Sequence, residues 1–520
     1  MSAGQQKTET VRLRSTRPDL GKEFDNEAVA TDHVRRLLLA GPYPGMGTGD
    51  PDLYKAFGWR FWQLARADGA IGVVLPRSAL SAAGSRPWRE TVLEYGGFTD
   101  VTMLLNTGGW VFDDAEHRYT IGIVVVRKGA AHAGLVRLRG PYPSLAAYTS
   151  GVDEKPAEIA VADFLSWSEG ASFPLLPTAR SVEIFIKLRQ HPRLDSAGDD
   201  WRPRPVREFD ATNDKRHFIF DADDGPRYAW PVYKGESFNL WAPDTGIYYA
   251  WVDPGEIVEV LQQKRLRQQR LARSAFSGFP RAWATNTATL PCRRPRIAFR
   301  GITNRTNQRT VIAALVPPRL VLTNAAPYLL WPQGDERDEA YLLGVLSSIP
   351  LDWYARRVVE VNLNLYLFNA FPVPRPGRDD PDRRRVEEIA GRLAAVDRRY
   401  ADWAGAVGVP VGGVPAGERE PLLAELDAVV ARLYGLTESE LTHVFETFHA
   451  GWNYAPRLAA VWAPTTAVGR GEGSDEHREP ARVRDERSRA AGRRRDQRPS
   501  GVPARGDAAP AAAVDCLRLR

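Results

Sequence analysis

A polar turn between two apolar segments carries the side chains that are best suited to contact nucleic acid. The segment RIAFRGITNRTNQRTVIAALVPPRLVLTN begins at Arg296, and its pattern predicts a strand, a turn and a second strand, with Ile297 and Phe299 alternating with Arg296 and Arg300. Arg binds guanine edges and phosphates, and Asn and Gln bind adenine edges. Residues of these types in the turn are Arg300, Asn304, Arg305, Asn307, Gln308 and Arg309. The turn is either an ordinary solvated turn or a loop that reads DNA.

A second basic segment precedes this turn. The stretch LQQKRLRQQRLARS begins at Leu261, predicts a helix, and has only Glu259 as a nearby acid. Its basic residues are Lys264, Arg265, Arg267, Arg270 and Arg273. Such a helix can lie along the phosphate backbone of DNA, whose charge dominates contacts of this kind. A charged, solvated helix face is an equal alternative.

The overall composition adds little support for a nucleic-acid partner. Of the net charge of +6, the tail from Pro464 onward contributes +4, with 13 Arg against 9 acidic residues. The Arg-rich stretch 487–498 in this tail either binds nucleic acid non-specifically or is inert.

The two Cys, Cys292 and Cys516, exclude a disulfide framework and a thiolate zinc site, and the His residues lack metal-binding spacing, so no metal is expected. No apolar run of about 18 residues and no signal sequence occurs, which predicts a cytoplasmic protein.

The first 130 residues predict an α/β layer. Asp50 and Pro51 predict the start of a helix. Its apolar residues at helical spacing are Leu53, Phe57, Phe61 and Leu64. The run 70–75 is almost wholly apolar, as in a strand that is buried on both faces. A further helix and two strands are predicted at 86–95, 99–105 and 119–127.

The rest of the chain predicts strands and then helices. Residues 236–375 are rich in strand signals, and the stretch EAYLLGVLSSIPLDWYARRV, which begins at Glu339, predicts one buried helix. Amphipathic helices are predicted at 383–402, 418–434 and 437–448. From residue 464 the chain has hardly any bulky apolar residue, so we expect it to be disordered.

Taken in order, these segments resemble the C-terminal half of large adenine-N6 DNA methyltransferases of single-chain restriction–modification and phage-defence systems. The end of the family's catalytic domain resembles DLYKAFGWRFWQLARADGAIGVVLP and WVFDDAEHRYTIGIVVVRKG. Blocks of its target-recognition region resemble REFDATNDKRHF, VYKGESFNLW, RIAFRGITNRTNQRTVIAALVPP, YLLGVLSSIPLDWYARRVV and LNLYLFNAFPVPRP. Its closing helical segment resembles LLAELDAVVARLYGLTESEL. The resemblance spans residues 45–450.

The resemblance implies an α/β fold: the C-terminal part of a Rossmann-like S-adenosylmethionine-dependent methyltransferase sheet, then a mixed α+β target-recognition domain and a helical segment. The implied regions are 1–45 (unassigned), 46–130 (partial catalytic domain), 131–235 (connecting region), 236–375 (target recognition), 376–450 (helical segment) and 464–520 (tail). The family's Gly-rich cofactor loop and its Asn/Asp-Pro-Pro-aromatic motif have no counterpart here; AGPYPGMGTGD has no Asn or Asp before a Pro-Pro pair. We therefore expect no catalytic residue in this chain, and a strand at 70–75 whose partner strand belongs to a complementary half.

The resemblance also suggests roles for single residues. Phe112, in GGWVFDD, stands where the family places an aromatic against the extruded adenine. Packing in the core is the favoured alternative for Phe112, and Trp110 is a competing candidate. Tyr54 and Lys55 lie near the place where the family binds the adenine of its cofactor, although a packed Tyr and a surface Lys are the simpler interpretation.

The sequence thus predicts the C-terminal portion of a site-specific DNA adenine-N6 methyltransferase, with double-stranded DNA as a partner and S-adenosylmethionine as the family's cofactor. We expect the isolated chain to be inactive in methyl transfer. Two alternatives stand beside this interpretation. One is a non-catalytic DNA-specificity subunit that works with a separately encoded catalytic half, and the other is an inactive remnant.

Overall fold

A computed structural model describes ten ranges of the chain: 3–117, 119–129, 134–167, 170–196, 201–220, 226, 228–303, 307–360, 362–449 and 451–462. Residues 1–465 form one compact unit. Asn304, Arg305 and the tail predicted to be disordered from residue 464 lie outside the described residues.

The first sheet has the strand order β1-β3-β2-β4-β5. Its strands are β1 (Ala70–Pro76), β2 (Gly96–Leu105), β3 (Thr120–Lys128), β4 (Leu135–Tyr142) and β5 (Ala157–Ala160). β3 is antiparallel to both β1 and β2, so β1 and β2 are parallel to each other. β4 joins parallel to β2, and β5 pairs antiparallel with β4. The predicted α/β layer is confirmed, but the sheet continues past residue 130, the predicted end of the partial catalytic domain.

Strand β1 lies at an edge of this sheet, and the prediction that it is buried on both faces is wrong for this chain. Within the described residues β1 pairs only with β3, so its other edge has no strand beside it. Leu75 is buried and Ile71 and Val73 pack partly on the core, whereas Val74 on the opposite face is 55% exposed. The apolar composition of β1 is therefore compatible with a second covering layer that the described residues do not supply.

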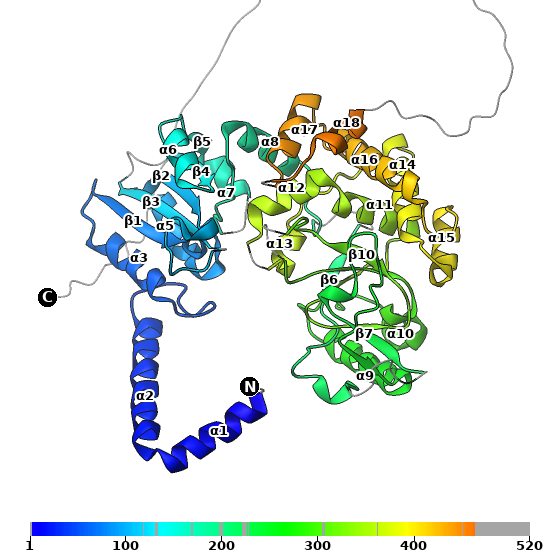
Figure 1. Ribbon diagram of the computed structural model, residues 1–520, viewed down its shortest axis with the longest axis horizontal. Helices are drawn as coiled ribbons and strands as arrows, with labels where there is room; N and C mark the ends of the chain where they lie inside the picture. Colours follow the sequence, from blue (N-terminus) through cyan, green and yellow to red (C-terminus); the bar gives the residue numbers. More distant parts are fainter. Residues whose placement is uncertain are drawn as a thin grey trace, which may run out of the picture. The chain divides into compact units, whose positions relative to one another are not determined.

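Helix α3 (Leu53–Leu64) forms as predicted but presents an unexpected face to the sheet. The buried apolar side chains are Ala56, Trp59 and Trp62, while the four residues expected inside are exposed by 36–67%. Trp59 and Trp62 are larger than the competing side chains, so burying them removes more apolar surface from water. The helix begins after Asp52, not after Asp50 as predicted. α3 lies against β1 (Figure 1), the strand whose other edge is open.

The helices that follow β1 join the sheet to the rest of the unit. α4 (Arg77–Ser81) is short, and α5 (Arg86–Tyr95) forms where the sequence predicts it, with Trp88, Val92 and Leu93 buried. Arg89 of α5 is also buried, and its guanidinium donates to the carbonyls of Gly170, Ala171, Ala79 and Ala82. One arginine thus fixes α5 to the segment that leads into the second half of the chain.

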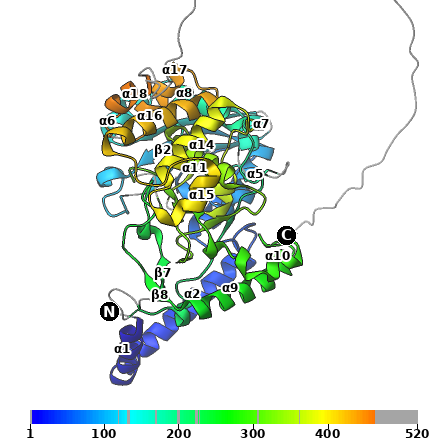
Figure 2. The ribbon, with the colours of Figure 1, turned by 90° about the vertical axis from the view of Figure 1, so that its right-hand side faces the viewer.

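Two smaller sheets form the region predicted to recognise DNA. The first has the order β10-β9-β12-β6 and the second β11-β7-β8. Their strands are β6 (Arg204–Val206), β7 (Trp230–Tyr233), β8 (Ala250–Val252), β9 (Arg296–Phe299), β10 (Ala313–Val316), β11 (Val321–Leu322) and β12 (Tyr328–Leu330). α9 (Pro254–Gln269) packs Ile257 and Leu261 against β7 and β8, near which it runs in Figures 1 and 2. β6, which pairs with β12, lies before residue 236, the predicted start of this region.

A helical layer follows, seen with α11, α14, α15 and α16 together in Figure 2. Its helices are α11 (Glu336–Ser347), α12 (Ile349–Val358), α13 (Leu365–Asn369), α14 (Pro381–Ala394), α15 (Ala401–Val407), α16 (Ala416–Leu433), α17 (Glu438–Glu446) and α18 (Ala455–Trp462). The single helix predicted from Glu339 is two helices, because Ser348 caps α12 and Pro350 occupies its first turn. The helix predicted at 383–402 is likewise divided into α14 and α15. At Gly344 an added Cβ would lie 2.5 Å from Val386, so α11 and α14 approach closely there.

The remaining helices connect these layers or precede them. Helices α1 (Ala3–Thr16) and α2 (Pro18–Ala40) lie within residues 1–45, the region left unassigned from the sequence. The helices that connect the layers are α6 (Leu145–Gly151), α7 (Val161–Trp167), α8 (Ala179–Arg189) and α10 (Arg281–Thr285). No helix of the described residues is both long and apolar enough to cross a membrane.

The buried carboxyl group of Glu339 makes the stability of the helical layer depend on pH. Burial raises the pKa of Glu339 to about 7, against the opposing effects of Arg294 and of the hydrogen bond donated by Trp403. The folded state therefore holds a proton that the unfolded chain has already lost. The contribution of Glu339 to the free energy of unfolding is complete below the pKa that this group has in the unfolded chain. This contribution is lost as the pH rises through about 7.

We expect Glu339→Gln to be more stable relative to wild type at pH 8 than at pH 5. Urea denaturation at both pH values measures the two free energies of unfolding. The same substitution at Glu388, which is half-exposed, controls for the loss of a negative charge. An equal difference at both pH values would contradict the assignment.

Candidate nucleic-acid interface

The predicted hairpin exists, but its first arginine lies inside the protein. β9 and β10 pair antiparallel from Arg296 with Val316 to Phe299 with Ala313. All four residues of β9 are buried, so the predicted alternation of apolar and exposed basic residues is wrong. Arg296 forms an ion pair with Glu208 at 2.9 Å, and both side chains are 2% exposed. Arg296 therefore connects β9 to the segment that follows β6, and its guanidinium is used inside the protein.

The far end of the hairpin loop is held by Asp352 of α12. The Asp352 carboxylate is fully buried and accepts from Arg309 Nε at 2.5 Å. It also accepts from the backbone N–H groups of Thr310 and Val311, at 3.0 and 2.9 Å. Arg309 donates further to the carbonyls of Ser347 and Ser348. Arg309, predicted to contact DNA, therefore already uses its guanidinium to attach the loop to the helical layer.

Two more arginines fix the same loop. Arg356 of α12 donates to the carbonyls of Asn307 and Gln308, at 2.7 and 2.5 Å. Arg300 donates to the carbonyl of Phe238, at 2.6 Å, and burial lowers the pKa of Arg300. The backbone of the loop is thus held from both sides. Two further residues of this loop were predicted to bind DNA. Gln308 has an exposed side chain, and Asn307 is partly buried, with its amide donating to Thr303.

The basic helix divides into an inner and an outer part. Arg265 is 2% exposed and donates to Thr289, Gln262 and Asn286. Lys264 forms a 2.6 Å ion pair with Asp214. Arg267, Arg270 and Arg273 are exposed, and the last two follow the end of α9 at Gln269. The exposed arginines are therefore available to phosphates, whereas Lys264 and Arg265 hold the helix in place.

Phe112 is exposed and lies on the loop between β2 and β3. Its side chain is 44% exposed, so the favoured interpretation of core packing is wrong. Asn106 holds this loop by accepting from the N–H groups of Val111 and Phe112 and donating to the Phe112 carbonyl. Trp110 donates to the carbonyl of Leu105. The loop follows the carboxyl end of β2, the edge where α/β sheets bind ligands.

Lys55 is not a surface residue. It is 7% exposed and donates to the carbonyls of Thr48 and Asp50, which fixes the segment before α3. The cavity between Tyr54, Lys55 and Gly84 has a volume of only about 10 Å³. The described residues therefore leave little room beside Lys55, whose ammonium is already hydrogen-bonded.

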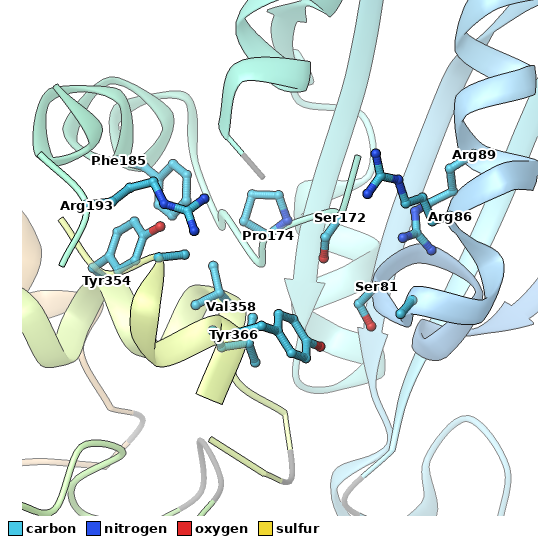
Figure 3. A pocket seen from close by; sticks show the side chains of 13 residues that line it. Ser81, Arg86, Arg89, Ser172, Pro174, Phe185, Arg193, Tyr354, Val358 and Tyr366 are labelled. Carbon is cyan, nitrogen blue, oxygen red and sulfur yellow. The ribbon is translucent and has the colours of Figure 1, made fainter. Parts of the chain in front are cut away.

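A larger cavity of about 190 Å³ lies between α4, α5, α8, α12 and α13 (Figure 3). Its apolar wall includes Pro174, Val358 and Tyr366. Its cations already have partners, because Arg86 pairs with Glu90 and Arg193 with Asp195. The described lining thus combines an apolar wall with arginines that already form ion pairs.

Sequence inspection missed Asp352 and Arg356, which place the loop. A signal was present, since an acid and paired arginines in the strongly apolar stretch IPLDWYARRV need buried partners. Their partners lie more than 40 residues away in sequence, so the spacing gives no indication of the contact.

We expect Asp352→Asn to destabilise the protein by about 3–5 kcal/mol, as measured when one partner of a buried ion pair is removed. Gln308→Ala, in the same loop, should leave the free energy of unfolding nearly unchanged because its side chain is exposed. Chemical denaturation followed by tryptophan fluorescence measures both. Equal stability of Asp352→Asn and wild type would show that the loop is held by other contacts.

Solved structures match over most of this chain at low similarity. No protein-family model matches it, and no curated protein is significantly similar to it. The type IIG restriction endonuclease BpuSI is 14% identical with a TM-score of 0.28, and the type IIL restriction-modification enzyme MmeI, solved with DNA, is 13% identical with a TM-score of 0.36. Each match covers 76% of this chain and 51% of the other. The DrdV–DNA complex is 11% identical with a TM-score of 0.30, covering 70% and 42%. This chain thus spans about half the length of the first two proteins, and such scores carry no argument about its activity.

Proposed function

We propose that this chain is the DNA-recognising portion of a restriction–modification type adenine-N6 DNA methyltransferase. The observation that carries the proposal is the order β1-β3-β2, with β3 reversed between two parallel strands. This order supports the expectation that the first sheet is the closing half of a methyltransferase sheet. Separate small sheets and a helical layer then follow, in the order that the resemblance implies.

The exposed groups support a division of roles within this proposal. Arg267, Arg270 and Arg273 provide positive charge for phosphates, and Gln308 provides an amide for a base edge. Phe112 provides an exposed ring at the carboxyl edge of the first sheet, where it would stack on a base extruded from the duplex. Arg300, Arg309, Lys264 and Arg265 act in the proposal by holding these elements in place.

The proposed cofactor of the whole enzyme, S-adenosylmethionine, does not fit the described residues near Lys55. The cavity there is small, and the Lys55 ammonium already donates to two carbonyls. In this proposal the described residues of this chain carry out no step of methyl transfer. The same observation favours the alternative of a non-catalytic DNA-specificity subunit, in which another polypeptide carries out the chemistry.

Both versions of the proposal need a complementary catalytic half, and the surface of β1 and α3 suits one. The open edge of β1 exposes backbone N–H and C=O groups, and Val74 exposes an apolar side chain beside it. Phe57 and Phe61 of α3 are stacked at 5.8 Å and exposed. A partner that adds a strand to β1 would satisfy the edge and cover these rings. Large exposed apolar patches commonly mark protein interfaces.

We expect the triple substitution of Arg267, Arg270 and Arg273 by Ala to weaken binding to mixed-sequence duplex DNA. The slope of log affinity against log salt should fall by about 0.9 for each phosphate contact that is lost. Fluorescence anisotropy across a salt series measures both quantities.

The matched control removes three exposed arginines of the helical layer, Arg384, Arg398 and Arg419, so the net charge is the same. An equal loss of affinity and slope in this control would mean that binding follows overall charge. Absence of DNA binding by the wild-type chain would overturn the proposed function.

We expect the chain to form a complex with a protein encoded in the reading frame immediately upstream, if that protein carries the Gly-rich and Asn/Asp-Pro-Pro-aromatic motifs. Val74→Asp should abolish co-purification, because it places a charge beside the open edge of β1. Val411→Asp, at a valine 39% exposed in the helical layer, should not. An upstream frame without these motifs, or a complex that tolerates Val74→Asp, would contradict the complementary-half proposal.

A further inference from the structure

Ile302 is an exposed apolar side chain on a rigid part of the β9–β10 loop. It is 68% exposed, which is the highest value among the large apolar residues described after residue 170. Single exposed apolar residues are common on protein surfaces and need no explanation by themselves. The contacts of its neighbours distinguish Ile302 from such a residue.

The residues on either side of Ile302 are fixed. Gly301 donates its N–H to the carbonyl of Ala325, and its carbonyl accepts from Leu363 N–H, both at 2.9 Å. Thr303 is 1% exposed and donates to the carbonyl of Thr310 at 2.8 Å. Ile302 itself forms a bridge with Asn362. A β-branched side chain also has few rotamers, so the position of Ile302 is well defined.

Two exposed amide side chains accompany Ile302, one on its bridge partner and one in the same loop. Asn362, its bridge partner, is exposed, as is Gln308 in the same loop. Tyr366, at the start of α13, is 51% exposed. Amides bind base edges, and apolar side chains inserted between base pairs unstack them. A rigid aliphatic tip beside exposed amides suits insertion better than a flexible one, because little conformational freedom is lost on binding.

We propose that Ile302 is a wedge that inserts into the DNA base stack and unstacks one base step. This inference rests on the proposed DNA-binding function and adds to it a specific contact and a deformation of the DNA. The wedge makes no covalent contact and needs no cofactor. It lowers the cost of extruding a base, since an unstacked step is already partly opened.

The test uses the full chain and duplexes that it recovers from a random-sequence pool. 2-Aminopurine replaces the adenines of a recovered duplex one at a time, because the fluorescence of this base rises when it is unstacked. We expect wild-type protein to raise the fluorescence several-fold at one position. Ile302→Ser should abolish the rise, and Ile302→Leu, which keeps an aliphatic tip, should retain it.

The control is Ile247→Ser, at an isoleucine 52% exposed in the same region but outside this loop, and it should leave the rise intact. Unchanged thermal midpoints of both serine variants would exclude misfolding as the cause. Absence of a rise at every position, or a rise that survives Ile302→Ser, would overturn the wedge. Failure to recover any duplex would overturn the proposed function itself, and the wedge with it.

Discussion

The arrangement of the proposed recognition surface depends on one buried carboxylate, Asp352. An ionised carboxylate away from water is tolerated only when it is paired and hydrogen-bonded. Asp352 meets this condition with Arg309 and with the N–H groups of Thr310 and Val311. Because α12 also packs on α16 and α17, the orientation of the β9–β10 loop is set by helices that come later in the chain. The loop and the helical layer therefore behave as one structural element.

This constraint changes the interpretation of the basic residues. Three of the basic residues, Arg296, Arg309 and Arg265, each make several contacts inside the protein. The number of basic residues in these segments therefore does not give the positive charge that DNA would meet. In the proposed function, the exposed arginines after Arg265 contact phosphates, and the part of the loop around Ile302 contacts bases. A surface of this kind combines electrostatic affinity from one element with positioning from another.

Helices and strands were predictable from the sequence where the apolar pattern of a segment was compatible with only one type of element. The helix at 86–95 formed as expected because its apolar residues recur at helical spacing. The β9–β10 hairpin also formed, although all four residues of β9 are buried and the predicted alternation is absent. The buried face of α3 was not predictable, since both of its faces are apolar and only the position of the sheet selects Trp59 and Trp62. The exposure of Val74 and the pairing of Arg309 likewise depend on tertiary contacts that sequence spacing does not contain. The break at Ser348 was visible in principle, because Ser followed by Pro two residues later is a helix-start signal.

The central claim is that duplex DNA contacts both the β9–β10 loop and the end of α9. Hydrogen–deuterium exchange of the full chain, with and without mixed-sequence duplex at low salt, tests it most directly. We expect slower exchange in the peptides that cover residues 261–274, 299–303 and 307–312, with no change in α14 to α16. Slower exchange confined to α14 to α16, or no change anywhere under conditions where DNA is bound, would contradict it.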